Sequence, residues 1–550
     1  QLSQDYDQYC PVHGSRRRKG KVGLITVQSL LRKFDDPQGP TSYLYRQKFT
    51  LQEFIAKCIR KQKRAALTGQ ERRRKEKIMR KITRSLWIIS FAFLFLFTAF
   101  HGLQNLQTTV NGDLGADSLI VLYVSLAISS LVVPSFLISR LGCKMTIIAA
   151  MFVYVLYHFV NFLPRYYSLL PVSVLTGVAG SCLWAAKCTY ITECGIRYAK
   201  LNFEAQGTVI VRFFGYFFMI VHLGQVLGNL LSSLIFTSAM KKTQALEDRV
   251  DDTCGKGFPW NETELSPRAM EQLRRPEASV FAGVCAAYLG CALVAVMIVS
   301  CCLNALLKDA ISRRHPPAFS PEILKLTVLN LRNVRMLLLI PLTIFNGLEQ
   351  AFLVGVFTKA FVGCGMGIPQ IGYIMTAFGI SDAVCSLVFG PLMKLFGRMP
   401  LFVFGAVINM LMICTLVIWS VNPADTIIFY VIAGVWGMAD GVWNTQINGI
   451  WVALVGRQSL EFAFASYRFW ESLGLAAGYA LTRTVRVQVF LLIAFCVLLV
   501  GITGYVIIEL YEYILNYAKT LCAVCVIGNR KPLPGAVPNS MQASLISRST

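Results

Sequence analysis

The chain repeats itself inside its apolar segments. Phe100-His101-Gly102-Leu103-Gln104 returns as Phe345-Asn346-Gly347-Leu348-Glu349, and Val211-Arg212-Phe213-Phe214 returns as Tyr467-Arg468-Phe469-Trp470. Internal repeats within hydrophobic sequence are typical of transporter-type bundles, in which two halves enclose a central cavity. The repeat therefore predicts two equivalent halves before any single residue is interpreted.

Long apolar runs account for most of the chain. Hydrophobic residues make up 55% of it and charged residues 15%, and the mean hydropathy is +0.55. A helix needs about 20 apolar residues to cross the hydrocarbon core. Continuous runs of this kind must be helices rather than barrel strands, whose side chains alternate in polarity. Twelve runs qualify, near residues 84–106, 117–139, 144–162, 168–194, 209–236, 279–303, 336–358, 370–393, 400–420, 426–451, 464–481 and 487–513.

These runs predict an all-α membrane protein with twelve transmembrane helices in two pseudo-symmetric six-helix bundles. The expected parts are a basic cytosolic tail (1–83), a first bundle (84–303), a cytosolic linker (304–335), a second bundle (336–513) and a cytosolic C-terminal tail (514–550). A long polar segment precedes the first run, so we expect no signal peptide. The chain begins with Gln1 rather than Met, which leaves the true N-terminus open.

Positive charge is concentrated before the first span. Residues 1–84 hold 22 Lys and Arg against 7 Asp and Glu. Such a tail suits nucleic acid or anionic lipid, and twelve spans favour membrane lipids over nucleic acid as the partner. Basic loops stay on the cytosolic side, which places both termini and the linker there. The basic residues of the linker are Lys308, Arg313, Arg314, Lys325, Arg332 and Arg335.

The largest predicted outer loop carries two features that suit an extracytosolic location. Asn261-Glu262-Thr263 is a candidate N-glycosylation site at Asn261. Cys254 lies in the same loop and Cys364 in another outer loop, where oxidising conditions permit a disulfide. The sequence leaves open whether these two cysteines are bonded, because it does not give their distance.

No catalytic signature appears in the sequence. Gly363-Cys364-Gly365-Met366-Gly367 lacks the strand–helix context of a dinucleotide loop, and no metal-ligand spacing such as His-Glu-x-x-His occurs. We therefore expect no enzyme, no cofactor and no metal site.

The candidate functional residues are ionisable groups inside the spans. A charge at the bilayer centre costs roughly 2.5–3.5 kcal/mol even on the mildest scale, so each one needs a partner or a wet cavity. The functional interpretation is an inner-facing cavity in which carboxylates bind a cation or a proton. Its expected members are Lys187, Glu349, Asp382, Asp440, Asn444 and Glu471, with His101 and His222 as titratable neighbours.

The charged residues inside the spans also have a purely structural interpretation. Arg212 and Arg468 lie near the inner ends of their spans, where long basic side chains extend to the interface, and we favour that role for both. The acids could equally form structural pairs between helices. Arg468 and Glu471 are three residues apart, share a helix face and can pair. For Glu349 and Asp440 we favour the cavity role.

Several segments resemble known membrane proteins. Leu141-Gly142-Cys143-Lys144 and Phe396-Gly397-Arg398 occupy equivalent inner turns and are similar to a degraded form of the Gly/Asp/Arg-rich turn of the major facilitator superfamily, without its acidic residue. Within that superfamily the chain resembles the uncoordinated-93 family. The segments that carry this likeness are Gly102-Leu103-Gln104-Asn105-Leu106-Gln107, Gly180-Ser181-Cys182-Leu183-Trp184-Ala185-Ala186, Gln225-Val226-Leu227-Gly228-Asn229-Leu230 and residues 463–474.

The resemblance implies regulation rather than ordinary transport. One family member is a regulatory subunit of a two-pore-domain potassium channel, and another escorts Toll-like receptors from the endoplasmic reticulum to endolysosomes. We therefore expect a potassium channel regulator in the plasma membrane. The alternatives are a secondary transporter of a cation or small solute, and a receptor escort of the endoplasmic reticulum or endolysosome. The sequence identifies neither the client nor a solute.

Overall fold

The computed structural model describes residues 62, 67–239, 253–259, 264–305, 325, 332–455 and 460–528. Within them the chain is helical and contains no strand. Asn261, most of the tail 1–83 and most of the linker lie outside the described residues. Two compact units are distinguished. Thr192–Arg212 and the described residues up to Arg84 form the smaller unit, and the described residues of Ser85–Ile191 and from Phe213 onward form the larger one.

The described part of the first half contains six long helices. They are α3 (Gly69–Val110), α4 (Gly112–Ser130), α5 (Val133–Val160), α6 (Tyr166–Asn202), α7 (Gln206–Ala239) and α9 (Ala278–Cys302). Between α7 and α9 lie the short helices η3 (Gly255–Gly257) and α8 (Pro267–Gln272). In α8 the Ser266 hydroxyl accepts the amide N–H of Ala269 at 3.0 Å, which caps the helix N-terminus.

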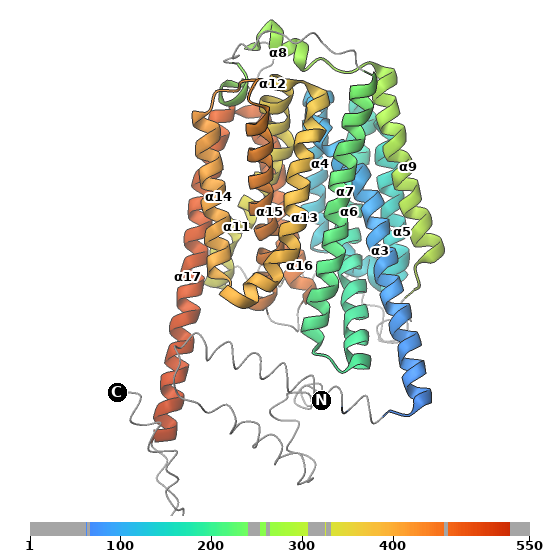
Figure 1. The fold of residues 1–550 in the computed structure, drawn as a ribbon, viewed down its shortest axis with the longest axis vertical. Helices are drawn as coiled ribbons and strands as arrows, with labels where there is room; N and C mark the ends of the chain where they lie inside the picture. The colour runs from blue at the N-terminus through green and yellow to red at the C-terminus, as the bar shows by residue number, and fades with distance from the viewer. Residues whose placement is uncertain are drawn as a thin grey trace, which may run out of the picture. The chain divides into compact units, whose positions relative to one another are not determined.

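The second half begins with one long helix that changes its type along its length. α11 (Val334–Ala351) continues through a π-helical stretch, η5 (Phe352–Gly363), into α12 (Cys364–Met366). The remaining helices are α13 (Ile368–Phe396), α14 (Met399–Ile418), α15 (Thr426–Val455), α16 (Leu460–Thr484) and α17 (Val487–Gly528). Figure 1 shows the helices of the larger unit side by side, with α8 at one end of them.

The predicted span 117–139 is not one continuous helix. The helix breaks after Ser130, and α5 starts at Val133 with Pro134 in its first turn. Proline lacks an amide N–H and its ring clashes with the preceding turn, so the helix is interrupted there. The same α5 contains Gly142 with φ 76°, which joins the end of one predicted span to the start of the next.

The two halves share backbone details at equivalent positions. Gly142 and Gly397 occupy the repeat-related inner turns, and both have positive φ, at 76° and 87°. This conformation costs little only for glycine. In the first half a Cβ on Gly228 would lie 2.1 Å from the Thr98 carbonyl oxygen, and in the second a Cβ on Gly474 would lie 2.1 Å from the Ile344 oxygen. The same pair of helices therefore packs closely in each half.

Eleven helices of the described chain are long and apolar enough to cross a membrane. α16 is not among them, although it spans 25 residues, because it carries Arg468, Glu471 and Arg483. It packs against α4 and α11, so its polar groups are shielded by other helices. With α16 the bundle has the twelve helices that the sequence predicts.

The smaller unit holds one of the two repeat-related arginines. Arg212 Nη2 lies 2.9 Å from Glu204 Oε2, and Asn202 donates to the other oxygen of that carboxylate at 2.6 Å. The Arg212 side chain is 38% exposed. This arginine therefore combines partial exposure with a carboxylate partner.

Candidate functional site

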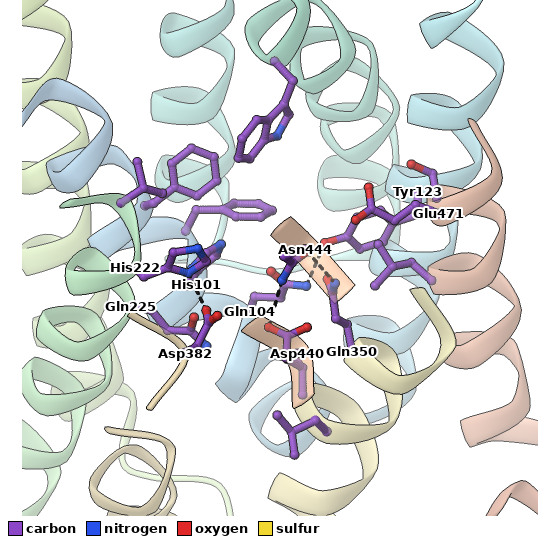
Figure 2. A pocket seen from close by; sticks show the side chains of 18 of the residues that line it. His101, Gln104, Tyr123, His222, Gln225, Gln350, Asp382, Asp440, Asn444 and Glu471 are labelled. Carbon is purple, nitrogen blue, oxygen red and sulfur yellow. Dashed lines mark hydrogen bonds and ion pairs between the residues drawn. The ribbon is translucent and has the colours of Figure 1, made fainter. Parts of the chain in front are cut away.

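A polar cavity of about 140 Å³ lies in the larger unit and is lined by residues of both halves. α3, α4, α5, α6 and α7 contribute from the first half, and α11, η5, α13, α15 and α16 from the second. Figure 2 shows their polar side chains gathered in one place. The charged and amide-bearing residues of the lining are His101, Gln104, Asn105, His222, Gln225, Gln350, Asp382, Asp440, Asn444, Asn448, Arg468 and Glu471.

An ion pair joins the two halves at this cavity. His222 of α7 contacts Asp382 of α13 through Nδ1 and Oδ2, as Figure 2 shows. Both side chains are buried, and Ser386 donates its hydroxyl to the other oxygen of Asp382 at 3.4 Å. The contact therefore links α7 of the first half to α13 of the second half, away from bulk water.

Neutral hydrogen bonds also cross between the halves. The Gln104 amide donates to the Tyr123 hydroxyl of α4 at 2.7 Å and to the Tyr479 hydroxyl of α16 at 3.0 Å. The rings of these two tyrosines stack with centroids 5.8 Å apart. Gln104 therefore fixes one wall of the cavity by using both of its donor hydrogens.

Asp440, Asn444 and Gln350 form a chain of polar contacts that joins α15 to α11. The Asn444 amide donates to Asp440 Oδ2 at 2.9 Å, and the Gln350 amide donates to the Asn444 oxygen at 3.4 Å. These contacts are visible in the centre of Figure 2. Asp440 is 4% exposed, so its surroundings are the cavity and the neighbouring helices rather than bulk water.

Arg468 and Glu471 pair on α16, as their spacing predicts. Arg468 Nη1 lies 2.6 Å from Glu471 Oε2. The other carboxylate oxygen accepts from the Tyr467 hydroxyl at 2.7 Å and from the Asn346 amide at 3.2 Å. Arg468 also lies 4.2 Å from the centroid of the Trp184 ring. The preferred expectation for Arg468, extension to the cytosolic interface, is wrong because the side chain lines the cavity instead.

Two of the six predicted cavity residues do not line it. The lining includes Asp382, Asp440, Asn444 and Glu471, while Lys187 and Glu349 lie behind its wall. Lys187 is 1% exposed, and its ammonium group faces four aromatic rings at 4.4–5.5 Å from their centroids. Cation–π attraction accounts for a buried ammonium among rings. The rings belong to Trp184, Phe214, Phe217 and Phe218.

Glu349 points into the second half. Its Oε2 accepts hydrogen bonds from the Asn409 amide of α14 and from the Trp436 indole N–H of α15 at 3.2 Å. The residue is 1% exposed. Its position next to Asp440 follows from the packing of α11 against α15. A binding role for these residues stays a prediction.

Sequence reasoning missed several cavity residues, of which Gln104 and Gln225 are the clearest. Both occur in segments singled out for another reason, Gln104 in the repeat and Gln225 in the family-like segment of α7. A signal was therefore available, since a buried amide between apolar residues also needs a partner. The predicted cavity members are ionisable residues and, on the helix face of Asp440, Asn444, so buried amides elsewhere were not predicted.

The structure also bears on the predictions about the two cysteines and about metal sites. Cys254 and Cys364 are joined by a disulfide, with their Cα atoms 5.6 Å apart. The bridge ties the segment before η3 to α12. Among the described residues no group of three or more His, Cys, Asp and Glu side chains is placed to hold a metal ion.

Known proteins match this chain over most of its length. The family model described as "Ion channel regulatory protein UNC-93" matches residues 107–506. The "Putative potassium channel regulatory protein unc-93" of Caenorhabditis elegans is 60% identical over 517 residues, which cover 93% of this chain and 72% of that protein. "Protein unc-93 homolog A" of Xenopus laevis is 39% identical over 448 residues, covering 79% and 94%.

Solved structures give the fold. A point mutant of the nucleoside transporter NupG superimposes with a TM-score of 0.53 at 14% sequence identity, over 77% of this chain and 99% of that one. At this identity the likeness extends to the fold alone, and that fold is the one of major facilitator transporters. With the repeat, the twelve helices and the matched segments in agreement, the chain belongs to the UNC-93 family.

Proposed function

We propose that this protein is an accessory subunit that regulates a potassium channel in the plasma membrane. The observation that carries the proposal is its 60% identity over 517 residues with a relative named as a putative potassium channel regulatory protein. That similarity covers nearly the whole chain, so no large part of the bundle is left for a different activity. The role is non-enzymatic, and the partner is another membrane protein.

The orientation belongs to the same proposal. The basic N-terminal tail and linker face the cytosol together with the C-terminus, and the bundles extend over 84–303 and 336–513. The disulfide supports this assignment, because a bond between Cys254 and Cys364 suits the oxidising outer side. Glycosylation at Asn261 would add a second marker of that side.

Contacts on the side of the disulfide suit a protein that holds its halves together. Arg483 of α16 pairs with Asp117 and lies 3.3 Å from Asp113 of α4. The Ser233 hydroxyl of α7 donates to the Pro369 carbonyl of α13 at 2.7 Å. An accessory subunit needs a stable surface for its channel more than it needs alternating access, and these contacts support such a surface.

Coexpression with potassium channels tests the proposal. The protein is expressed in oocytes with each of a panel of two-pore-domain channels, and the current and the surface amount of channel are both recorded. We expect altered conductance at constant surface amount for at least one channel. Affinity purification from native membranes should recover that channel. An unchanged current with every channel, together with recovery of a receptor or of no membrane protein, would refute the proposal.

Transport of a cation or small solute is the second candidate, favoured by the acid-lined cavity between the halves. It predicts solute flux in proteoliposomes that disappears in Asp440→Asn. The channel-regulator proposal predicts no flux from the wild-type protein. The two candidates therefore give opposite results in one assay.

A further inference from the structure

Two carboxyl groups contact each other within the second half, away from bulk water. Glu349 of α11 and Asp440 of α15 are 1% and 4% exposed. α11 packs against α15, and the two carboxyl groups interact electrostatically with each other. Each has one buried oxygen without a hydrogen-bond partner among the described residues. Two carboxylates both accept hydrogen bonds and neither donates one, so a hydrogen bond between these two groups requires a proton.

The hydrogen-bond donors around the pair bind only one oxygen of each carboxyl group. Glu349 Oε2 accepts from Asn409 and Trp436, and Asp440 Oδ2 accepts from Asn444 at 2.9 Å. The remaining oxygens, Glu349 Oε1 and Asp440 Oδ1, receive no hydrogen bond from any donor group among the described residues. One proton shared by the two carboxyl groups would satisfy both of these oxygens.

The neighbouring charges do not replace the proton. No lysine or arginine of the described chain pairs with either carboxyl group, and Arg468 is held by Glu471. The nearest acids are Asp382, which pairs with His222 of α7, and Glu471. Two ionised carboxylates in contact would add to this negative charge in a low-dielectric setting, where like charges repel strongly.

We propose that Glu349 and Asp440 form a proton-binding site that holds one proton in this arrangement of the helices. Asp440 lines the cavity whereas Glu349 does not, so the proton exchanges with water through Asp440. Glu349 acts as the inner half of the site, oriented by the Asn409 amide and the Trp436 indole.

The site is electrostatically linked to the contact between the halves. Asp382 interacts with both members of the pair and also with His222 across the interface. Loss of the shared proton therefore changes the field at an ion pair that joins α7 to α13. This inference does not depend on channel regulation, since a proton site serves a regulator or a transporter equally.

Infrared spectroscopy of the purified protein in lipid nanodiscs tests the site directly. At neutral pH the wild type should show the carbonyl stretching band of a protonated carboxylic acid, which disappears reversibly at high pH. Glu349→Gln and Asp440→Asn should each lose this band, because the new amide donates to the remaining carboxylate and takes the place of the proton. The matched control is Glu264→Gln, which alters an exposed acid paired with Arg486 and should leave the band unchanged.

Three results would overturn the proposal. The first is absence of the band in the wild type, and the second is its persistence in both folded variants. The third is a band present in choline buffer and absent in potassium buffer, which would assign the site to a metal cation instead. If the variants do not fold, Trp436→Phe decides, because it keeps both carboxyl groups and removes one donor to Glu349. Its band should shift in frequency, and an unshifted band counts against Glu349.

Discussion

Replacing Glu471 by Gln should strongly destabilise the protein. Glu471 is 2% exposed and lies 2.6 Å from Arg468, which is 25% exposed. Removal of one partner from a buried ion pair leaves the other charge uncompensated, at a cost of about 3–5 kcal/mol. The matched control is Glu76→Gln on α3, whose partner Arg72 lies 3.3 Å away, with the Arg72 and Glu76 side chains 70% and 44% exposed. That change should cost about 0–1 kcal/mol, as exposed pairs do.

The assay is the free energy of unfolding in mixed micelles, measured by denaturant titration. The double variant Arg468→Gln/Glu471→Gln separates the pair from its surroundings, because two amides leave no charge buried. We expect it to recover most of the loss caused by Glu471→Gln. It should remain somewhat below the wild type, since Arg468 also gives up its cation–π contact with Trp184 at 4.2 Å, worth about 0.5–2 kcal/mol. If Glu471→Gln costs no more than Glu76→Gln, or if the double variant recovers nothing, the pair is not a buried ion pair.

Three further changes probe the packing of the larger unit. Gly474→Val should prevent normal folding, because a Cβ there would lie 2.1 Å from a backbone oxygen of α11. The control Gly283→Val should be tolerated, because a Cβ at Gly283 meets no neighbouring atom within 4 Å. The measurement is the surface expression of the two variants. Cys254→Ser should lower the free energy of unfolding by about 2–5 kcal/mol through loss of its bridge to Cys364, and wild type treated with reductant should match it. Tyr479→Phe removes one of two hydroxyl partners of a cavity amide and should cost about 1 kcal/mol, with a loss above about 3 kcal/mol counting against this account.

Much of the architecture could be predicted from hydropathy and repetition. Apolar runs fix which segments cross the membrane, because lipid leaves helix as the only satisfactory backbone state for them. The repeat-related glycines Gly142 and Gly397 identified equivalent turns, and both adopt positive φ. Local rules failed at Pro134, where a proline inside an apolar run divides a predicted span into two helices. Hydropathy averages over such a residue and does not detect it.

Individual contacts at the candidate site were predictable where two residues share one helix. The spacing of Arg468 and Glu471 fixes their common face, and their pairing is confirmed. The direction in which a buried side chain points depends on residues of other helices that pack against it. The sequence alone does not show which residues these are. Lys187 therefore faces aromatic rings instead of the cavity, and Glu349 turns toward Asn409. The contact of His222 with Asp382 across the halves has no signal in either segment alone.

Two equivalent positions of the repeat carry different polar groups and make different contacts. Gln104 and Glu349 occupy equivalent positions in it, and both are buried. Gln104 donates to Tyr479 of the opposite half. Its amide is neutral, so it brings no net charge to the place between the two tyrosine hydroxyls. A carboxylate at that place would lose the donor hydrogens and bring a charge to the interface. The acid at the equivalent position instead faces inward, where Trp436, Asn409 and the Asp440 carboxyl surround it. At this repeat position the first half thus supplies a neutral contact to the opposite half, and the second half supplies a buried carboxyl group that is bonded within its own half.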